Sequence, residues 1–296
     1  MSAAAPDIWT VVALLRWMEG HFRARGLDSP RLDAECLLAH ALGLSRLDLY
    51  LQHDKPVVES ERAALRELVR RRARERVPVA QLTGRKEFWS LPLAVDGNVL
   101  VPRPETETLV ETALTFLPDP EGEYRILDVG TGSGAIALAL AHERRKARVL
   151  ATDVSAAALE VARGNACRLG LADRVSFAAG SLLEPAAGQR FDLVVSNPPY
   201  LALGEAAGLP PELAHEPPEA LFAGPDGLAV LAPLVAGVAC VLATSAGFVV
   251  ELAPDQAEGV AVACAAAGLR DVRVIRDLAG RPRVVAASAP DGEEGI

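Results

Sequence analysis

The sequence predicts an α/β protein in which a small all-helical part precedes a mainly parallel, doubly wound sheet. From about residue 106 onward, strand and helix patterns alternate, which favours parallel strands joined by helices. Residues 7 to about 77 instead carry apolar side chains at helical spacing. We therefore expect a helical domain over residues 1–77, a hairpin linker over 78–104, an α/β domain over 105–288 and a frayed tail over 289–296.

The helical domain contains three predicted helices. Apolar residues from Trp9 to Phe22 recur at helical spacing and predict the first. Asp28-Ser29-Pro30 supplies a cap and a helix-starting proline, so the second is expected from Arg31 to Leu42. The third is expected from Ser60, as its N-cap, to Arg76. Helices of this length can pack as a small bundle.

A run of arginines ends the third predicted helix. The run has two interpretations. It is either a solvated helix face, which we favour, or a patch that docks an acidic partner. The whole chain has a net charge of −9, so it gains no general electrostatic attraction to nucleic acid. The run consists of Arg70, Arg71, Arg72, Arg74 and Arg76.

The stretch between the two domains has the pattern of a β-hairpin. Its apolar residues alternate with others between Phe88 and Val95. Gly97-Asn98 is a turn dipeptide, and Val99, Leu100 and Val101 follow as a second strand.

The α/β domain is expected to contain seven strands with helices between most of them. The predicted strands are Arg125–Val129, Arg148–Thr152, Arg174–Phe177, Phe191–Ser196, Gly247–Leu252, Asp271–Ile275 and Arg283–Ala287. The predicted helices are Thr106–Leu117, Ala135–Glu143, Ser155–Leu169, Leu228–Leu242 and Asp255–Ala267.

Several classes of protein are not indicated. The longest apolar run, Leu228 to Val250, is broken by Pro233 and is interpreted as a buried helix followed by a strand rather than a membrane span. The start of the chain lacks a positive n-region, so we expect no secretory signal and a cytoplasmic protein. The four cysteines form no CxxC pair and the histidines no HxxxH pair, so no metal is expected.

A glycine-rich loop joins the first predicted strand to its helix, from Gly130 through Thr131, Gly132 and Ser133 to Gly134. Glycines permit a tight turn and let a ligand approach the backbone, and the following helix N-terminus presents free N–H groups. The loop also fits the relaxed dinucleotide pattern. Asp128, two residues before it, would repel a pyrophosphate but attract the ammonium of a methionine moiety.

Asp153 ends the second predicted strand of the sheet. A carboxylate at a strand end can accept both hydroxyls of a ribose, whether that ribose belongs to NAD or to S-adenosylmethionine. The alternative role is a helix N-cap, which Ser155 fits better.

The fourth predicted strand ends in Asn197-Pro198-Pro199-Tyr200, at the sheet edge where ligands bind. A planar amide or ring amine is a poor nucleophile until acceptors hold its N–H groups. The Asn197 side-chain oxygen and the Pro198 carbonyl, whose direction the prolines fix, are two such acceptors. Tyr200 offers an aromatic face for a flat group. The segment therefore predicts methyl transfer to a planar nitrogen, and the simplest alternative is a strand-ending turn.

The chain resembles the protein-(glutamine-N5) methyltransferases that modify peptide chain release factors. The resemblance covers most of residues 25–287. The motifs that carry it, besides the loop and strand ends already described, are Pro78-x-x-Gln81-Leu82-x-Gly84-x-x-Glu87-Phe88, Val99-Leu100-Val101-Pro102-Arg103-Pro104-Glu105-Thr106-Glu107 and Asp277-Leu278-Ala279-Gly280-Arg281. The Pro-Arg-Pro-Glu-Thr-Glu segment is much more specific than Asn-Pro-Pro-Tyr, which DNA methyltransferases share.

The resemblance implies a Rossmann-like, seven-stranded class I methyltransferase sheet behind a helical substrate-docking domain and a hairpin linker. It implies S-adenosylmethionine as cofactor and a glutamine in a Gly-Gly-Gln loop as substrate, held at Asn197 to Tyr200. Where some relatives carry an acidic and an aromatic residue near the adenine, this chain has Ser181-Leu182. The implied cofactor contacts are Asp128, Gly130, Thr131, Gly132, Ser133, Gly134, Asp153, Val154, Ser181, Leu182 and Asn197.

Other functions remain open from the sequence. A DNA or RNA amino-methyltransferase would use the same tetrapeptide on a flipped base, but the chain is acidic and lacks a basic recognition domain. A ribosomal-protein glutamine is another possible target. A nicotinamide dehydrogenase would leave Asn197 to Tyr200 unexplained, and a decayed, non-catalytic scaffold would lack motif residues that this chain retains. We expect a release factor as partner, and neither stable nucleic-acid binding nor membrane binding.

Overall fold

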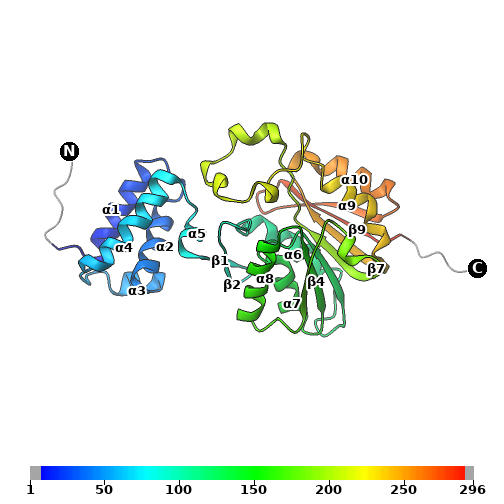
Figure 1. Ribbon diagram of the computed structural model, residues 1–296, viewed down its shortest axis with the longest axis horizontal. Helices are drawn as coiled ribbons and strands as arrows, with labels where there is room; N and C mark the ends of the chain where they lie inside the picture. The colour runs from blue at the N-terminus through cyan, green and yellow to red at the C-terminus, as the bar shows by residue number, and fades with distance from the viewer. Residues whose placement is uncertain (1–7, 291–296) are drawn as a thin grey trace, which may run out of the picture. The chain divides into compact units, whose positions relative to one another are not determined.

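The computed structural model describes residues 8–290, so the expectations for the start of the chain and for residues 291–296 of the tail lie outside the described residues. The chain divides into two compact units (Figure 1). The first covers the chain up to Gly84 together with Pro211–His215, and the second covers Arg85–Pro210 and the chain from Glu216 onward.

The first unit is all-helical, as expected, and its first two helices begin at residues that favour a helix start. The Thr10 hydroxyl accepts a hydrogen bond from the Ala13 N–H, and Pro30 occupies the first turn of the second helix. The unit consists of α1 (Val11–Arg23), α2 (Pro30–Leu42), α3 (Arg46–Leu51), α4 (Glu59–Arg70), one π-helical turn (Arg71–Glu75) and α5 (Val79–Thr83). The sequence did not predict α3 and α5, which are 6 and 5 residues long and too short to show a helical period.

The third helix has nearly the predicted extent, from Glu59 to Glu75 instead of about Ser60 to Arg76, but the predicted N-cap was wrong. Ser60 is not its N-cap, because the Glu61 carboxylate accepts a hydrogen bond from the Val58 N–H at 2.9 Å and the helix starts one residue earlier. At the other end α4 stops at Arg70 and the π-helical turn continues to Glu75, after which Arg76 has a left-handed backbone with φ of 63°.

The arginine run is not a uniformly solvated face. Arg72 is buried, and its guanidinium pairs with Asp33 at 2.7 Å and with Glu212 at 2.9 Å. The solvated-face interpretation was therefore wrong for this residue. The partner Glu212 belongs to the Pro211–His215 segment, which the first unit also holds by a hydrogen bond from Gln81 Nε2 to the His215 carbonyl at 2.8 Å.

The hairpin belongs to the second unit and turns earlier than predicted. Its strands are β1 (Arg85–Phe88) and β2 (Leu91–Ala94), so the hairpin turn is Trp89-Ser90. Gly97-Asn98 forms a turn, as predicted, but it is not the turn of the hairpin. Both residues of the hairpin turn have positive φ, 52° and 58°, as in a type I′ turn. Tertiary bonds offset this strain, because the Trp89 backbone N–H donates to Glu107 and its indole N–H to Glu143. Residues 99–101 form no strand.

The sheet of the second unit confirms the predicted class. Its seven strands run in the order β5-β4-β3-β6-β7-β9-β8, parallel except where β9 pairs with β7 and β8. The strands are β3 (Arg125–Val129), β4 (Arg148–Asp153), β5 (Val175–Ala179), β6 (Phe191–Ser196), β7 (Leu242–Glu251), β8 (Arg270–Arg276) and β9 (Pro282–Ser288). The helices are α6 (Glu107–Leu114), α7 (Ala135–Glu143), α8 (Ala156–Arg168), α9 (Leu231–Gly237) and α10 (Ala257–Ala266).

Alternate strand residues divide the core of this unit into two layers. Ile126 packs in the cluster that α6, α7 and the hairpin cover, whereas the next residue, Leu127, packs in the cluster of α9 and α10. Figure 1 shows these helices on the two faces of the sheet. Both faces are thereby buried, as a parallel sheet requires.

Between residues 8 and 290, no helix combines the length and the apolar character needed to cross a bilayer. The same residues contain no group of three or more His, Cys, Asp or Glu side chains placed to hold a metal ion.

Candidate active site

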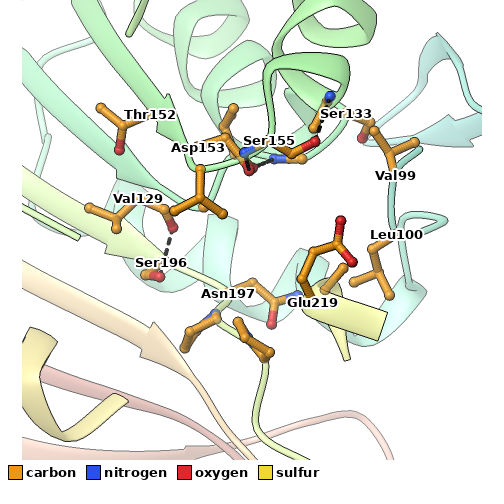
Figure 2. A pocket seen from close by; sticks show the side chains of 18 of the residues that line it. Val99, Leu100, Val129, Ser133, Thr152, Asp153, Ser155, Ser196, Asn197 and Glu219 are labelled. Carbon is orange, nitrogen blue, oxygen red and sulfur yellow. Dashed lines mark hydrogen bonds between the residues drawn. The ribbon is translucent and has the colours of Figure 1, made fainter. Parts of the chain in front are cut away.

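A cavity opens at the carboxyl ends of β3, β4 and β6 (Figure 2). The chain passes from β3 to β4 and β5 on one side and then crosses back to β6 on the other side of β3, so the strand order reverses at β3. Such a switch point leaves a crevice outside the strand ends, which is where open α/β sheets bind ligands. The fold itself therefore places the glycine loop, Asp153 and Asn197 around one space.

The glycine loop crosses the end of β3 in a conformation that only glycine adopts without strain. Gly130 and Gly132 have φ values of 73° and 54°, and a Cβ at either position would project into open space at the cavity. The N–H groups of Gly130 and Thr131 both donate to the Thr152 carbonyl, at 2.8 and 2.9 Å. The loop is thus fixed to β4, and its bare backbone forms one wall that a ligand can approach.

Asp153 holds the loop and faces the cavity. Its two carboxylate oxygens accept hydrogen bonds from the Gly132 N–H at 2.8 Å and the Ser155 N–H at 2.9 Å (Figure 2). The helix N-cap is Ser155, whose hydroxyl accepts from the Ala158 N–H, so the capping alternative for Asp153 does not apply. Each carboxylate oxygen keeps a free lone pair on the cavity side for hydroxyl donors.

Asp128 does not line the cavity. Its side chain is fully buried and accepts hydrogen bonds from the Thr131 hydroxyl at 2.7 Å and the Ala137 N–H at 3.1 Å. Burial is the main cause that raises the pKa of this carboxyl to about 7. The structure therefore does not support the expected direct contact of Asp128 with a ligand ammonium, and gives this residue the role of organising the loop from behind.

The tetrapeptide leaves the sheet where β6 ends. The Ser196 hydroxyl donates to the Val129 carbonyl at 2.7 Å, and Asn197 Nδ2 donates to the Thr106 hydroxyl at 3.2 Å (Figure 2 labels Ser196, Val129 and Asn197). Asn197, Pro198 and Pro199 line the cavity, but Tyr200 does not. The predicted role of the Tyr200 ring, to lie against the flat group of the substrate, stays a prediction.

The Tyr200 backbone is held in place by a distant segment. Gln256 Nε2 donates to the Tyr200 carbonyl at 3.1 Å and to the Gly227 carbonyl at 3.3 Å. Burial, followed by the charge of Glu251, raises the pKa of the Tyr200 phenol to about 12. The phenol therefore stays protonated at neutral pH.

The structure brings most of the predicted site residues together. On the cavity lining lie Gly130, Thr131, Gly132, Ser133, Asp153, Val154, Ser181, Leu182, Asn197, Pro198 and Pro199. Away from it lie Asp128, Gly134 and Tyr200. Gly134 is needed for packing, because a Cβ there would approach Leu138 and Ala162 at 3.1 and 3.2 Å.

Sequence reasoning gave no role to several residues of this site. Arg103, on the lining, pairs at 2.6 Å with Glu216, whose carboxyl is buried and has a pKa raised chiefly by that burial. Glu219 also lines the cavity (Figure 2). Glu216 and Glu219 lie in a segment of 3-10 turns that has no periodic pattern, so no sequence pattern indicated their role. Arg103 and Thr106 belong to the Pro-Arg-Pro-Glu-Thr-Glu motif, which marked their segment as part of the site.

The sheet order together with a glycine loop, a strand-end carboxylate and an Asn-Pro-Pro-Tyr segment defines a class I methyltransferase that uses S-adenosylmethionine. A methyltransferase small domain matches residues 106–225, and a PrmC N-terminal domain matches residues 13–84. The chain belongs to the family of release factor glutamine methyltransferases.

Curated relatives support this family assignment. The release factor glutamine methyltransferase of Rhodopirellula baltica is 45% identical over 290 residues, covering 94% of this chain and 95% of its own. That of Xylella fastidiosa is 46% identical over 260 residues, covering 88% and 94%. Among solved structures, the hMettl16 catalytic domain in complex with the MAT2A 3'UTR hairpin 6 has a TM-score of 0.55 at 15% identity, covering 82% and 87%, which shows the shared fold.

The residues of the cavity fit S-adenosylmethionine. The side-chain-free backbone at Gly130 and Gly132 leaves space for a ligand, and Asp153 places a carboxylate beside it for hydroxyl groups. Leu182 and Val154 add apolar surface for a flat base. The negative charge of Asp153 beside this space favours a cationic ligand over a pyrophosphate.

We expect Asp153→Asn to weaken S-adenosylmethionine binding by about 1.5–3 kcal/mol, the range for hydrogen bonds to a charged group. The amide keeps the shape of the side chain but loses the charge and one acceptor. Calorimetric titration of cofactor into both proteins measures the difference. Glu160→Gln, an exposed carboxylate on the following helix, is the matched control and should bind as the wild type does. An Asp153→Asn protein with unchanged affinity would remove this residue from the cofactor site.

Proposed function

We propose that this enzyme transfers a methyl group from S-adenosylmethionine to the side-chain amide nitrogen, N5, of the glutamine in the Gly-Gly-Gln loop of peptide chain release factors. The observation that carries the proposal is the placement of Asn197 and Pro198 on the lining of the cofactor cavity. Because Asn197 Nδ2 already donates to Thr106, the Asn197 oxygen remains as an acceptor for a substrate N–H.

The acceptors address the main obstacle to this reaction. An amide nitrogen has its lone pair delocalised into the carbonyl, so its N–H groups must be held while the lone pair turns toward the methyl group. The Asn197 oxygen and the Pro198 carbonyl can hold these two N–H groups, and two prolines in succession fix the direction of that carbonyl. S-adenosylmethionine supplies an activated methyl group on a sulfonium. Positioning of this kind can supply up to about 7–11 kcal/mol of the barrier.

The first unit is proposed to dock the release factor. Its exposed apolar side chains include Leu47, Tyr50 and Leu51 of α3, which are 67%, 48% and 69% exposed, and Val58 shortly after it. Leu47 and Leu51 are four residues apart on one helix face. Apolar side chains grouped in this way on a surface favour contact with a folded protein. An enzyme that methylates a small molecule would not need such a surface.

We expect Leu51→Glu to lower kcat/KM for intact release factor by about tenfold, the loss typical of an interface residue worth more than 1 kcal/mol. Methylation of a short peptide that contains the Gly-Gly-Gln sequence should be unchanged, because the peptide needs only the cavity. Val262→Glu is the control, since Val262 is 70% exposed on α10 of the second unit. Equal losses with protein and peptide would contradict a docking role.

The remaining partners and the location follow from the substrate. Release factors act with ribosomes, so we place the enzyme in the cytoplasm. The net charge of −9 gives no general attraction to nucleic acids or to anionic membranes, and we propose that neither is a stable partner.

A methyl-transfer assay with labelled S-adenosylmethionine tests the substrate. We expect transfer to a release factor, none to its Gln→Ala loop variant, and none to single-stranded or duplex DNA. Transfer to DNA without transfer to the release factor would overturn the substrate and leave the amino-methyltransferase chemistry intact. A ribosomal protein labelled in preference to the release factor would replace the substrate with another protein glutamine.

A further inference from the structure

A carboxylate is buried beside the catalytic segment. Glu251 ends β7 and is 1% exposed, and within residues 8–290 neither of its carboxylate oxygens has a hydrogen-bond partner of good geometry. A buried carboxylate in this state costs several kcal/mol unless it is neutral or compensated.

The position of Glu251 is set by the sheet. Ser196 of β6 lies opposite Val250 of β7 in a parallel pair, so Asn197 and Glu251 are the next residues along neighbouring strands. Thr106 lies close to both side chains. Its hydroxyl accepts the hydrogen bond from Asn197 Nδ2 at 3.2 Å and is also in polar contact with Glu251, whose pKa it lowers.

The single proton of the Thr106 hydroxyl makes this connection directional. When the proton points toward an ionised Glu251, only the oxygen lone pairs face Asn197, and Asn197 must present its NH₂ group. Its side-chain oxygen then points away from Thr106. When Glu251 is neutral it can donate to Thr106 instead, the Thr106 proton can turn toward Asn197, and the amide of Asn197 can rotate by half a turn.

We propose that Glu251 is a positioning residue, which acts through Thr106 to hold the Asn197 amide with its oxygen presented to the substrate nitrogen. This role rests on the proposed methyl transfer to an amide. It explains why a costly buried acid stands behind the catalytic segment, and it gives Thr106 of the Pro-Arg-Pro-Glu-Thr-Glu motif a function.

The groups around Glu251 set the pH at which this orientation is lost. Burial is the largest influence and raises the pKa of Glu251 to about 7, and Glu105 adds to the rise. The Thr106 hydroxyl, Arg283 of β9 and the Tyr200 hydroxyl lower it. As the pH falls through this value the carboxylate becomes protonated, so kcat should fall on the acid side.

Substitutions of Glu251 and Thr106 test the link by activity. We expect Glu251→Met, which leaves no acceptor for the Thr106 hydroxyl, and Thr106→Val each to lower kcat about ten- to a hundredfold, as for residues that orient a metal ligand, with cofactor affinity unchanged. Thr106→Ser keeps the hydroxyl and should keep kcat. The double variant should be no slower than either single one, because both remove the same link. Additive losses, or a slow Thr106→Ser enzyme, would overturn the proposal.

Stability separates positioning from support of the fold. The raised pKa means that the folded protein holds this proton more tightly than the unfolded chain, so ionisation of Glu251 lowers stability as the pH rises toward about 7. Glu251→Met should therefore melt no lower than the wild type at alkaline pH while it loses kcat. A lower melting temperature together with the loss of kcat would indicate structural support and contradict the proposal.

A measurement independent of activity follows the Asn197 side chain itself. In ¹⁵N-labelled enzyme, the side-chain NH₂ resonance of Asn197, assigned by its absence in Asn197→Ala, should shift with pH through about 7 in the wild type. It should not shift in Glu251→Gln. A pH-independent resonance in the wild type would overturn the link even if release factor is methylated. A titrating resonance in an enzyme that fails to methylate release factor would sustain the link and refute the proposed substrate.

Discussion

Asn197→Ala should lower kcat for release factor methylation by at least about a hundredfold, the loss seen when one acceptor or donor of a reacting group is removed. The Asn197 side chain lines the cavity and is held by Thr106, so its oxygen is an acceptor in a fixed position. Without the Asn197 oxygen, the lone pair of the substrate nitrogen stays delocalised into the carbonyl of the substrate amide. Single-turnover methyl transfer measures the effect, because it isolates the chemical step from product release.

The control is cofactor affinity in the same variant. The loop of Gly130 to Gly134 and Asp153 are unchanged, so the dissociation constant for S-adenosylmethionine should rise much less than kcat falls. A variant that kept more than a tenth of the wild-type kcat, a difference below about 1.4 kcal/mol, would show that Asn197 does not act on the reacting nitrogen.

Gly227→Ala should lower kcat by about a hundredfold although Gly227 touches no reacting group. It has a φ of 75°, and a Cβ there would stand 2.3 Å from the Tyr200 carbonyl oxygen and 2.9 Å from Gln256 Nε2. The backbone that follows Pro199 must therefore shift, and displacement of a catalytic group by about 1 Å can cost this much. The rate of methyl transfer to the Gly-Gly-Gln peptide measures it.

Gly204→Ala is the matched control for this substitution. Gly204 lies in the same segment after the tetrapeptide, and a Cβ there meets no atom within 4 Å. It should retain wild-type activity. If Gly204→Ala and Gly227→Ala lost activity equally, the effect would come from the general flexibility of the segment and the specific contact with Tyr200 would be irrelevant.

Parallel strands could be predicted closely because burial on both faces makes them continuous apolar runs. Arg125–Val129 and Phe191–Ser196 were predicted with the bounds that β3 and β6 have. The start of β7 was missed, since the structure begins it at Leu242 rather than at Gly247. The residues between these two positions, Ala243, Thr244, Ser245 and Ala246, are small or polar and carry a weak strand signal.

The hairpin shows how tertiary contacts can decide a turn. Gly97-Asn98 has the residues that favour a turn, whereas Trp89-Ser90 does not. The hairpin nevertheless turns at Trp89, because the backbone N–H of Trp89 donates to Glu107 and the indole N–H donates to Glu143. Those acceptors lie 18 and 54 residues further along the chain and are not visible in a local pattern.

The site was predictable where function requires a particular backbone or strand end. The glycine loop, Asp153 and Asn197 follow strands directly, so their meeting at one edge of the sheet follows from topology. Asp128 was expected to contact the ligand but is buried behind the loop, because the sequence alone does not show which way a side chain near a strand end points. Glu216 and Glu251 became apparent only through their burial.

The most direct test of the central claim is to locate the transferred methyl group. Release factor incubated with the enzyme and S-adenosylmethionine is digested, and fragment masses are read across the Gly-Gly-Gln peptide. We predict that one methyl group is added, that the fragments assign it to the glutamine, and that the Asn197→Ala enzyme adds none. A methyl group on any other residue of the release factor, or an unmodified glutamine in a reaction that consumes the cofactor, would contradict the account.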